Sequence, residues 1–187
     1  MTGTPTRPLA DLRISPIGLG GNVFGWTADE ATSFDVLDAY VDAGGNLVDT
    51  ADGYSYWAPG NSGGESETVI GSWLASRPVR DRIVLATKVS PKPDRSGLSA
   101  DNIDLALEES LSRLRTDVVD IYYAHFDDES VPLEETVAAF EDARRAGKIR
   151  HVGLSNYTPE RIRQWFAIAD SQGSARPIVL QPHYNLL

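Results

Sequence analysis

The chain has 187 residues, of which 41% are hydrophobic and 24% charged, as is typical of a globular domain that buries a substantial core. Its 17 basic and 27 acidic residues give a formal net charge of −10 without a basic patch, which argues against nucleic acid or an anionic membrane as a partner. The absence of cysteine excludes disulfides and thiolate metal sites and fits a cytoplasmic protein, and no apolar run is long enough to span a membrane.

Segments that favour strands alternate with segments that favour helices about every 30 residues. The segments that read as strands are residues 14–21, 46–49, 83–88, 118–125, 149–155 and 178–181. Helices are expected between Thr27 and Gly44, from Glu65 to Ala75, from Ser99 through Leu114, from Leu133 to near Gly147, and from Thr158 onward. This alternation predicts a parallel sheet with right-handed crossovers, and the lack of an interior linker predicts one domain over residues 1–187.

Local signals set several of these boundaries. Residues 1–13 form a polar lead-in that allows a short hairpin. Thr27 and Glu30 have the spacing of a capping box, which predicts that the first helix begins there. Gly44 and the glycine after it end that helix. A long loop with exposed aromatic residues and turn formers then separates the second strand from the helix at Glu65.

Two architectures fit this pattern, an open doubly wound sheet and a (β/α)8 TIM barrel. The dinucleotide fingerprint of the open sheet fails, because Gly18 and Gly20 supply its first two glycines but the third position is Val23. The barrel is favoured by polar residues at the C-terminal ends of separate strands, where barrel enzymes build their active sites. These residues are Asp49, Lys88, His125, Ser155, Asn156 and Gln181.

Each of these residues also has an ordinary structural explanation when it is taken alone. Asp49 could cap a turn, Lys88 could be a solvated strand end, and His125 could be a core histidine. Side-chain alternation nevertheless places Lys88 and His125 in phase with the apolar residues of their strands, so both are expected to face one interior. Together with Tyr54 they favour a proton-transfer site. The three histidines (His125, His151 and His183) lack metal-ligand spacing, and we expect no metal site.

The ordered motifs resemble the aldo-keto reductase family over nearly the whole chain. The matching motifs are Gly18-Leu19-Gly20, Val48-Asp49-Thr50-Ala51 with Gly53-Tyr54, Ser66-Glu67 with Ile70-Gly71, Ala86-Thr87-Lys88, Asp117 through His125, Gly147-Lys148-Ile149-Arg150 with Gly153-Leu154-Ser155-Asn156, and Gln181 with Tyr184-Asn185. Their order and spacing make the resemblance far more specific than any single motif. It implies a NADPH-dependent carbonyl reductase on a (β/α)8 barrel.

The resemblance also implies a role for each catalytic candidate. A carbonyl group that accepts hydride develops negative charge on its oxygen, and Tyr54 would donate the proton that it needs. A free phenol has a pKa of about 10 and gives up its proton reluctantly. The Lys88 ammonium would stabilise the phenolate, and Asp49 would hold Lys88 in place. His125 would hydrogen-bond the carbonyl oxygen and polarise it.

Further residues are assigned to cofactor and substrate by the same resemblance. The candidates for contact with the cofactor are Gly21, Asn22, Asp49, Ser155, Asn156 and Gln181, of which the last three would hold the nicotinamide carboxamide and the first two are weaker. The candidates for a substrate wall beside His125 are Trp26, Tyr56 and Trp57. Packing within the long loop explains these three aromatic residues about as well.

The chain departs from the family in length. About six strand–helix units are visible, whereas a closed barrel needs eight and typically ~250 residues. We therefore expect an incomplete barrel, truncated at its C-terminal side relative to the family, without the part that clamps the adenosine 2'-phosphate. Its first and sixth strands would present unpaired edges that invite self-association. Three functions stay open: a carbonyl reductase, a cofactor-sensing regulatory subunit, and an inactive truncated remnant.

Overall fold

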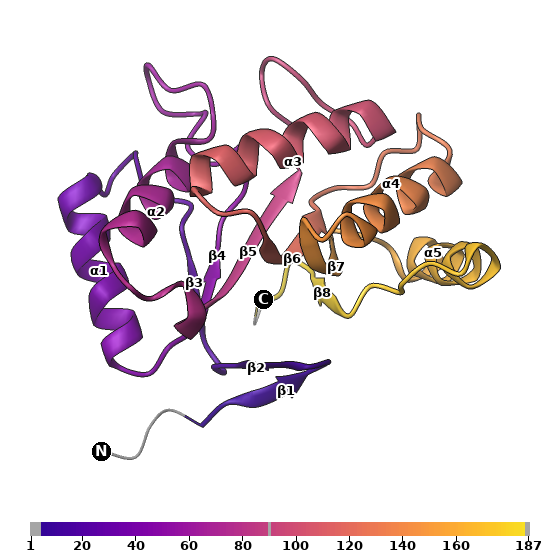
Figure 1. The fold of residues 1–187 in the computed structure, drawn as a ribbon. Coiled ribbons are helices and arrows are strands. Elements are labelled where there is room, and N and C mark those ends of the chain that lie inside the picture. The colour runs from indigo at the N-terminus through magenta and orange to yellow at the C-terminus, as the bar shows by residue number, and fades with distance from the viewer. Residues whose placement is uncertain (1–4, 90, 186–187) are drawn as a thin grey trace.

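Six parallel strands curl around the centre of the computed structural model, which describes residues 5–89 and 91–185. The helices lie on the outer side of the sheet (Figure 1). The strands are β3 (Gly18–Gly20), β4 (Leu47–Asp49), β5 (Val84–Val89), β6 (Val119–Ala124), β7 (Ile149–Ser155) and β8 (Val179–Gln181). They pair in the order in which they occur in the chain. The fold is an incomplete (β/α)8 barrel, and the sequence-based expectation is confirmed.

The helices follow the strands in the expected alternation. They are α1 (Glu30–Asp42), α2 (Glu65–Ser76), α3 (Ala100–Leu114), α4 (Leu133–Arg145) and α5 (Pro159–Gln172), with a short 3-10 helix at Arg80–Arg82. Their apolar stripes pack on the outer face of the sheet and form the main hydrophobic core. The large side chains in this layer include Leu37, Trp73, Leu107, Phe140 and Trp165, each at most 1% exposed.

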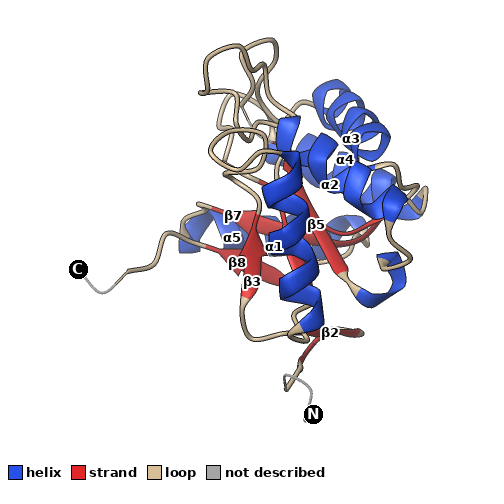
Figure 2. Ribbon diagram, turned by 90° about the vertical axis from the view of Figure 1, so that its left-hand side faces the viewer, coloured by secondary structure: helices blue, strands red, loops and turns tan. Residues whose placement is uncertain are grey.

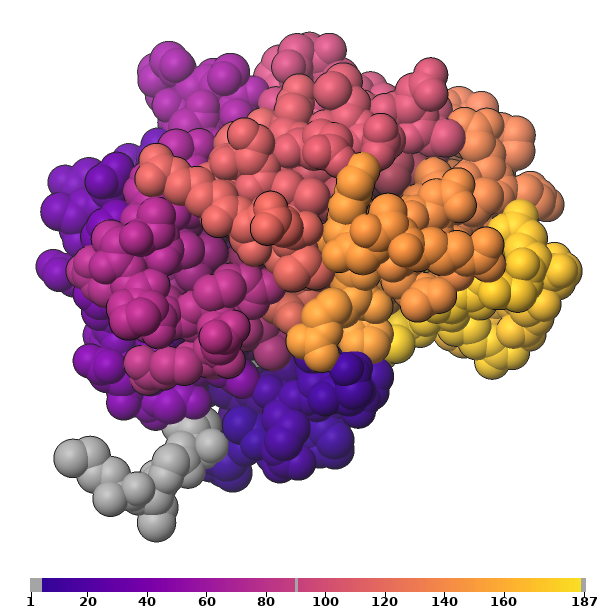
Figure 3. Space-filling model, in the orientation of Figure 1, coloured from indigo at the N-terminus to yellow at the C-terminus, as the bar shows by residue number. Residues whose placement is uncertain are grey.

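An N-terminal hairpin closes one end of the sheet. Strands β1 (Arg7–Leu9) and β2 (Leu12–Ile14) pair antiparallel, as the polar lead-in allowed. Leu12 is buried in a second apolar cluster with Val84, Ala86, Ile121 and Tyr123, which lie on the inner side of β5 and β6. The hairpin packs below the body of the molecule in Figure 3, and in Figure 2 the long loops gather at the opposite end of the sheet.

Two predicted boundaries near the N-terminus are wrong. The predicted strand over residues 14–21 is divided, because Ile14 belongs to the hairpin and β3 begins only at Gly18. Pro16 lies between them and has no N–H with which to continue a strand ladder. The capping box is also wrong, since Asp29 rather than Thr27 caps α1 and accepts from the Thr32 N–H at 2.8 Å. An aspartate caps a helix at least as well as a threonine.

The other helix signals are confirmed. Ser99 and Thr158 cap α3 and α5 through side-chain hydrogen bonds, and Pro159 occupies the first turn of α5. Gly44, with a φ of +87°, follows the last turn of α1, where a left-handed backbone favours glycine. Within the described ranges, no helix combines the length and the apolar character that crossing a membrane requires.

Candidate active site

The candidate site lies at the C-terminal ends of the strands, opposite the hairpin. Asp49 ends β4, Lys88 is the penultimate residue of β5, and His125 directly follows β6. Ser155 ends β7 and Gln181 ends β8, and these two residues are in register as a parallel pair. The polar residues at the strand ends therefore occupy one rim of the sheet, as barrel enzymes arrange them.

Lys88 is the centre of this cluster. Its side chain is fully buried, and its ammonium donates to both carboxylate oxygens of Asp49, at 2.8 and 2.7 Å. It also donates to the Thr50 carbonyl oxygen at 2.8 Å and to the Tyr54 hydroxyl oxygen at 3.0 Å. An ammonium has three N–H donors, so these acceptors occupy it completely. Such pairing is what allows a buried charge to persist.

The turn after β4 presents Tyr54 to this ammonium. The Thr50 N–H donates to the Ala86 carbonyl at 2.9 Å and the Asp52 N–H donates to the Lys88 carbonyl at 3.1 Å, so pairing with β5 continues beyond β4. The Tyr54 ring centroid is 4.7 Å from Lys88 Nζ. Because Lys88 donates to the phenol oxygen, the phenol's own proton is directed elsewhere.

His125 faces Tyr54 across the rim, with their ring centroids 5.9 Å apart and the planes at 69°. Its Nδ1 is buried and has no hydrogen-bond partner among the described residues. Burial, with a smaller contribution from the positive charge of Lys88, lowers the pKa of His125 from 6.5 to about 3. The imidazole is therefore neutral near pH 7 and keeps one N–H donor and one acceptor nitrogen.

Phe126 stacks on this imidazole at a centroid distance of 4.6 Å and an angle of 25°, and sequence analysis missed it. Its ring is 47% exposed. The available signal was an aromatic residue directly after a histidine at the end of a strand. Lys88 itself is in register with Tyr123 on the inner face of the sheet, and its Nζ lies 5.7 Å from that ring. The inward orientation expected from side-chain alternation is confirmed for Lys88.

The residues assigned to the nicotinamide carboxamide form one hydrogen-bonded group. Asn156 donates to the Ser155 hydroxyl at 3.1 Å and to the His125 carbonyl at 2.9 Å. The Ser155 hydroxyl donates to the Gln181 backbone carbonyl at 2.9 Å. The Gln181 side chain donates to Asp49 at 3.3 Å. Asn156 and Gln181 are solvent-exposed, and a hydroxyl with two amides is a donor and acceptor set that fits a primary carboxamide.

The two weaker cofactor candidates occupy different environments. Gly21 is buried, and its N–H donates to the Asp49 carbonyl at 2.8 Å while its carbonyl accepts from the Ser66 hydroxyl at 2.7 Å. A Cβ at Gly21 would lie 2.7 Å from that same hydroxyl oxygen. Both backbone groups of Gly21 are therefore engaged inside the protein. Asn22 is exposed beside it.

The candidate substrate wall is a cluster of half-exposed aromatic rings. Trp57 contacts the ring of Trp26 at 5.8 Å, that of Tyr56 at 5.5 Å and that of Tyr54 at 6.2 Å, each edge to face. Trp26, Tyr56 and Trp57 are 48%, 44% and 43% exposed, respectively. The cluster thus extends from the phenol of Tyr54 towards solvent, so its rings pack within the loop and are also accessible.

No group of three histidine, aspartate or glutamate side chains in the described part of the chain could hold a metal ion. The polar chemistry of the rim consists of a buried ammonium–carboxylate pair, a phenol and a neutral imidazole. These groups can hold and transfer protons beside a bound ligand. The fold and this rim together define a barrel-type protein with a cluster of titratable side chains at the C-terminal ends of its strands.

Comparison with known proteins agrees with this class. The model of the Aldo/keto reductase family matches residues 16–187, and the chain belongs to this family, as its motifs indicated. Protein tas of Escherichia coli (strain K12) is 33% identical over 206 residues, an alignment that covers 96% of this chain and 59% of that protein.

Two further relatives carry names that describe reductases. Aldo-keto reductase YhdN of Bacillus subtilis (strain 168) is 35% identical over 172 residues, covering 90% of this chain and 48% of that protein. Norsolorinic acid reductase stcV of Emericella nidulans is 37% identical over 166 residues, covering 80% of this chain and 41% of that protein. The chain therefore spans about half the length of these curated relatives.

Proposed function

We propose that this chain, alone or as part of a longer polypeptide, forms the catalytic centre of a cytoplasmic NADPH-dependent reductase that converts aldehydes or ketones to alcohols. The observation that carries the proposal is the 3.0 Å contact between the buried Lys88 ammonium and the Tyr54 hydroxyl. A phenol that is paired with an ammonium and lies beside a neutral imidazole is suited to proton donation.

The cofactor, when bound, supplies hydride to the carbonyl carbon. Tyr54 then gives its proton to the carbonyl oxygen, and the Lys88 ammonium stabilises the phenolate that this leaves. Asp49 fixes the ammonium through both carboxylate oxygens, 2.8 and 2.7 Å away. The neutral imidazole of His125 donates an N–H to the carbonyl oxygen and so stabilises the negative charge that develops there.

Residues around this centre hold the two ligands. The nicotinamide carboxamide would be held by the Ser155 hydroxyl at the end of β7 and by the side-chain amides of Asn156, which follows β7, and of Gln181 at the end of β8. The half-exposed rings of Trp26 and Trp57 border the carbonyl substrate. Support comes from two contacts: Gln181 donates to Asp49 at 3.3 Å, and the Trp57 ring lies 6.2 Å from the ring of Tyr54.

The test compares two tyrosines of the same loop. With Tyr54→Phe, we expect NADPH affinity, followed by nicotinamide fluorescence, to stay at the wild-type value while reduction of an aryl aldehyde falls by about 10²–10⁴-fold. Tyr56→Phe keeps the aromatic ring that is a candidate for the substrate wall and removes only its hydroxyl, so we expect it to keep the wild-type rate. A Tyr54→Phe protein as fast as the wild type would contradict the assignment of the proton donor.

The same titration separates the alternative functions. A folded chain that binds NADPH and reduces no carbonyl compound fits a cofactor-sensing regulatory subunit. Strands β3 and β8 each pair with only one neighbour among the described strands, and their edges favour self-association. Light scattering is therefore measured alongside the titration. Large assemblies that neither bind NADPH nor turn over a substrate fit an inactive remnant.

A further inference from the structure

A row of alternating charges lies behind the sheet and begins at the turn that carries Tyr54. The Asp52 carboxylate accepts from Arg95 Nη1 at 3.0 Å, and Arg95 Nη2 donates to Glu109 at 2.6 Å. Arg95 belongs to the loop after β5, and Glu109 belongs to α3. The Asp52 carboxylate is thereby joined to a helix on the outer side of the sheet.

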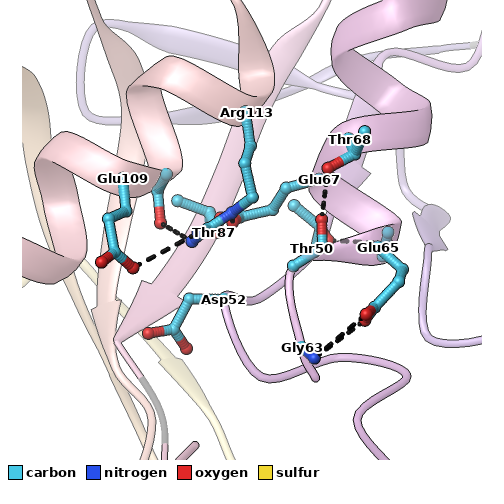
Figure 4. A network of polar contacts seen from close by, with 12 residues as sticks. Thr50, Asp52, Gly63, Glu65, Glu67, Thr68, Thr87, Glu109 and Arg113 are labelled. Atoms are coloured by element: carbon cyan, nitrogen blue, oxygen red, sulfur yellow. Dashed lines mark hydrogen bonds and ion pairs between the residues drawn. The ribbon is translucent and has the colours of Figure 1, made fainter. Parts of the chain in front are cut away.

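The row continues from α3 to β5. Glu109 accepts from Arg113 Nη1 at 3.3 Å, and Arg113 Nε donates to Glu67 of α2 at 2.7 Å. Glu67 also accepts from the Thr87 hydroxyl at 2.5 Å. Figure 4 shows Glu67, Thr87, Glu109 and Arg113 close together, with Asp52 below them in this view.

Both ends of the row are connected to β5, the strand that carries Lys88. Thr87 is the residue before Lys88 in β5, and the Asp52 N–H donates to the Lys88 carbonyl at 3.1 Å. Asp52 also lies two positions before Tyr54. One carboxylate therefore anchors the phenol-bearing turn, while the backbone of the same residue joins that turn to the lysine.

Most of these charges are buried, although Glu109 is 35% exposed, and the pairing of the buried charges is therefore essential. Asp52 and Glu67 are fully buried, and the Arg95 and Arg113 side chains are 10% and 20% exposed. Removing one partner of such a pair leaves an uncompensated charge in a poorly solvated place. A carboxylate in that position either binds a proton or moves towards water, and a movement towards water displaces the turn that carries it.

The C-terminal end of the loop that carries Tyr54 packs closely against Asp52 and Arg113 of the same row. Gly63 and Gly64 have φ values of +99° and +92°. A Cβ at Gly64 would lie 2.6 Å from Arg113 Cδ, and one at Gly63 would lie 3.1 Å from the Asp52 carbonyl oxygen. Glycine allows this close approach and this backbone conformation together. The loop over residues 52–64 is thus held at both ends.

We propose that Asp52 and Arg95 are positioning residues whose ion pair fixes the turn that places the Tyr54 hydroxyl against Lys88. The inference deepens the proposed function and rests on it for its kinetic consequence. Neither residue touches the reacting groups, and both act through Tyr54. Since a misplacement of about 1 Å can reduce turnover ~10²-fold, a small movement of this turn is enough to matter.

The experiment neutralises the pair one side at a time and then on both sides. Arg95→Met removes the positive charge and keeps most of the volume, and we expect kcat for carbonyl reduction to fall about 10²-fold while KM stays within a few-fold. Asp52→Asn keeps an acceptor for Arg95, and its effect is smaller. The double variant has no unpaired carboxylate, and we expect it to regain most of the lost kcat.

A second readout does not depend on turnover. Amide hydrogen exchange of residues 50–57, followed by mass spectrometry, should accelerate in Arg95→Met and return towards the wild-type rate in the double variant. This measurement reports how readily the turn opens, even in a protein that reduces no carbonyl compound. Absent turnover in the wild type would therefore overturn the proposed function, whereas unchanged exchange in Arg95→Met would overturn the positioning role.

Arg80→Met is the matched control. Arg80 pairs with Asp120 at 2.9 Å, and the Asp120 side chain, which also accepts from Arg150, is only 4% exposed, but this pair lies at the opposite end of the sheet. We expect Arg80→Met to lower the melting temperature and to leave kcat and exchange of residues 50–57 at wild-type values. Equal losses of kcat in Arg80→Met and Arg95→Met would show a general structural role and contradict the proposal.

Discussion

The Gln181 side-chain amide donates to Asp49 Oδ2 at 3.3 Å, although the two residues are 132 positions apart in the sequence. Asp49 ends β4 and Gln181 ends β8, and three strands lie between them in the sheet order. Only a strongly curled sheet can bring these two strand ends into contact. The incomplete barrel therefore already has the curvature that joins the carboxamide-binding candidates to the Asp49–Lys88 pair.

Replacing Gln181 should weaken cofactor binding. Gln181→Leu removes an amide that we assign to the nicotinamide carboxamide, and a neutral hydrogen bond contributes about 0.5–1.5 kcal/mol. We therefore expect the Kd for NADPH, from fluorescence titration, to rise by roughly 2–13-fold. Gln172→Leu is the control, since Gln172 is exposed at the end of α5 and donates to the Glu134 carbonyl at 3.2 Å. Equal affinities of the two variants would contradict the assignment.

Removing the buried ammonium should reduce stability as well as turnover. Lys88→Met leaves the Asp49 carboxylate, which is 9% exposed, without its cation. Breaking a buried ion pair from one side typically lowers the free energy of unfolding by about 3–5 kcal/mol. Urea denaturation measures this loss, and the aldehyde assay measures turnover.

Adding Asp49→Asn to Lys88→Met tests the cause of that loss. The double variant has no buried charge at this position, so it should be more stable than Lys88→Met while it stays without reductase activity. If the double variant were no more stable than the single one, lost packing rather than an unpaired carboxylate would explain the destabilisation.

Local patterns were sufficient for most of the fold. The apolar spacing of Ile103, Leu107 and Leu111 predicted a helix with one buried face, and all three residues are buried in α3. Side-chain alternation predicted the inward orientation of Lys88, because two-residue periodicity holds wherever a strand is paired. Such signals need only neighbours in the sequence, so they can be read without a structure.

Long-range partners were outside the reach of those patterns. Nothing in the sequence shows that Leu12 of the hairpin would cover Val84 and Ile121 at one end of the sheet. Asp52 and Arg95 are likewise 43 positions apart, and no spacing rule joins an acidic turn residue to a basic residue on another loop. Burial decides the importance of such an ion pair, and burial is a property of the folded chain.

Helices α2 and α3 meet at Gly71, where a side chain should not be tolerated. A Cβ at this position would overlap the Arg113 backbone carbonyl, which cannot move away as a flexible side chain could. Overpacking of this kind costs about 1–3 kcal/mol or more, and each 1 kcal/mol lowers Tm by roughly 2–4 °C in a chain of this size. We expect Gly71→Ala to lower Tm accordingly in calorimetry. Ser72→Ala is the control, and a similar Tm for both variants would contradict the close approach.

Trp26 should affect substrate binding more than chemistry. Trp26 is 48% exposed. Its ring contacts that of Trp57, and Trp57 in turn contacts Tyr54. We expect Trp26→Ala to raise KM for a bulky aromatic aldehyde several-fold, with a much smaller effect on KM for propanal and on kcat. Leu105→Ala removes a side chain on α3 that is 52% exposed, and KM should not change. Equal effects on both aldehydes would argue that Trp26 only packs the loop.

His125 should make the stability of the protein depend on pH. Burial, and to a lesser extent the charge of Lys88, lowers its pKa from 6.5 to about 3. Between these values the unfolded chain binds a proton that the folded chain does not bind. The contribution of His125 to stability is therefore complete above pH 6.5 and decreases as the pH falls, by about 1.4 kcal/mol per pH unit.

Urea denaturation at pH 7 and pH 5 measures this contribution. Carboxyl groups with a lowered pKa, such as Glu141 at about 2 instead of 4.5, respond mainly below this range. We expect the wild type to lose roughly 2 kcal/mol more than His125→Gln between the two pH values. His183→Gln replaces an exposed histidine and should follow the wild type. If His125→Gln lost as much stability as the wild type, His125 would not be held neutral by burial.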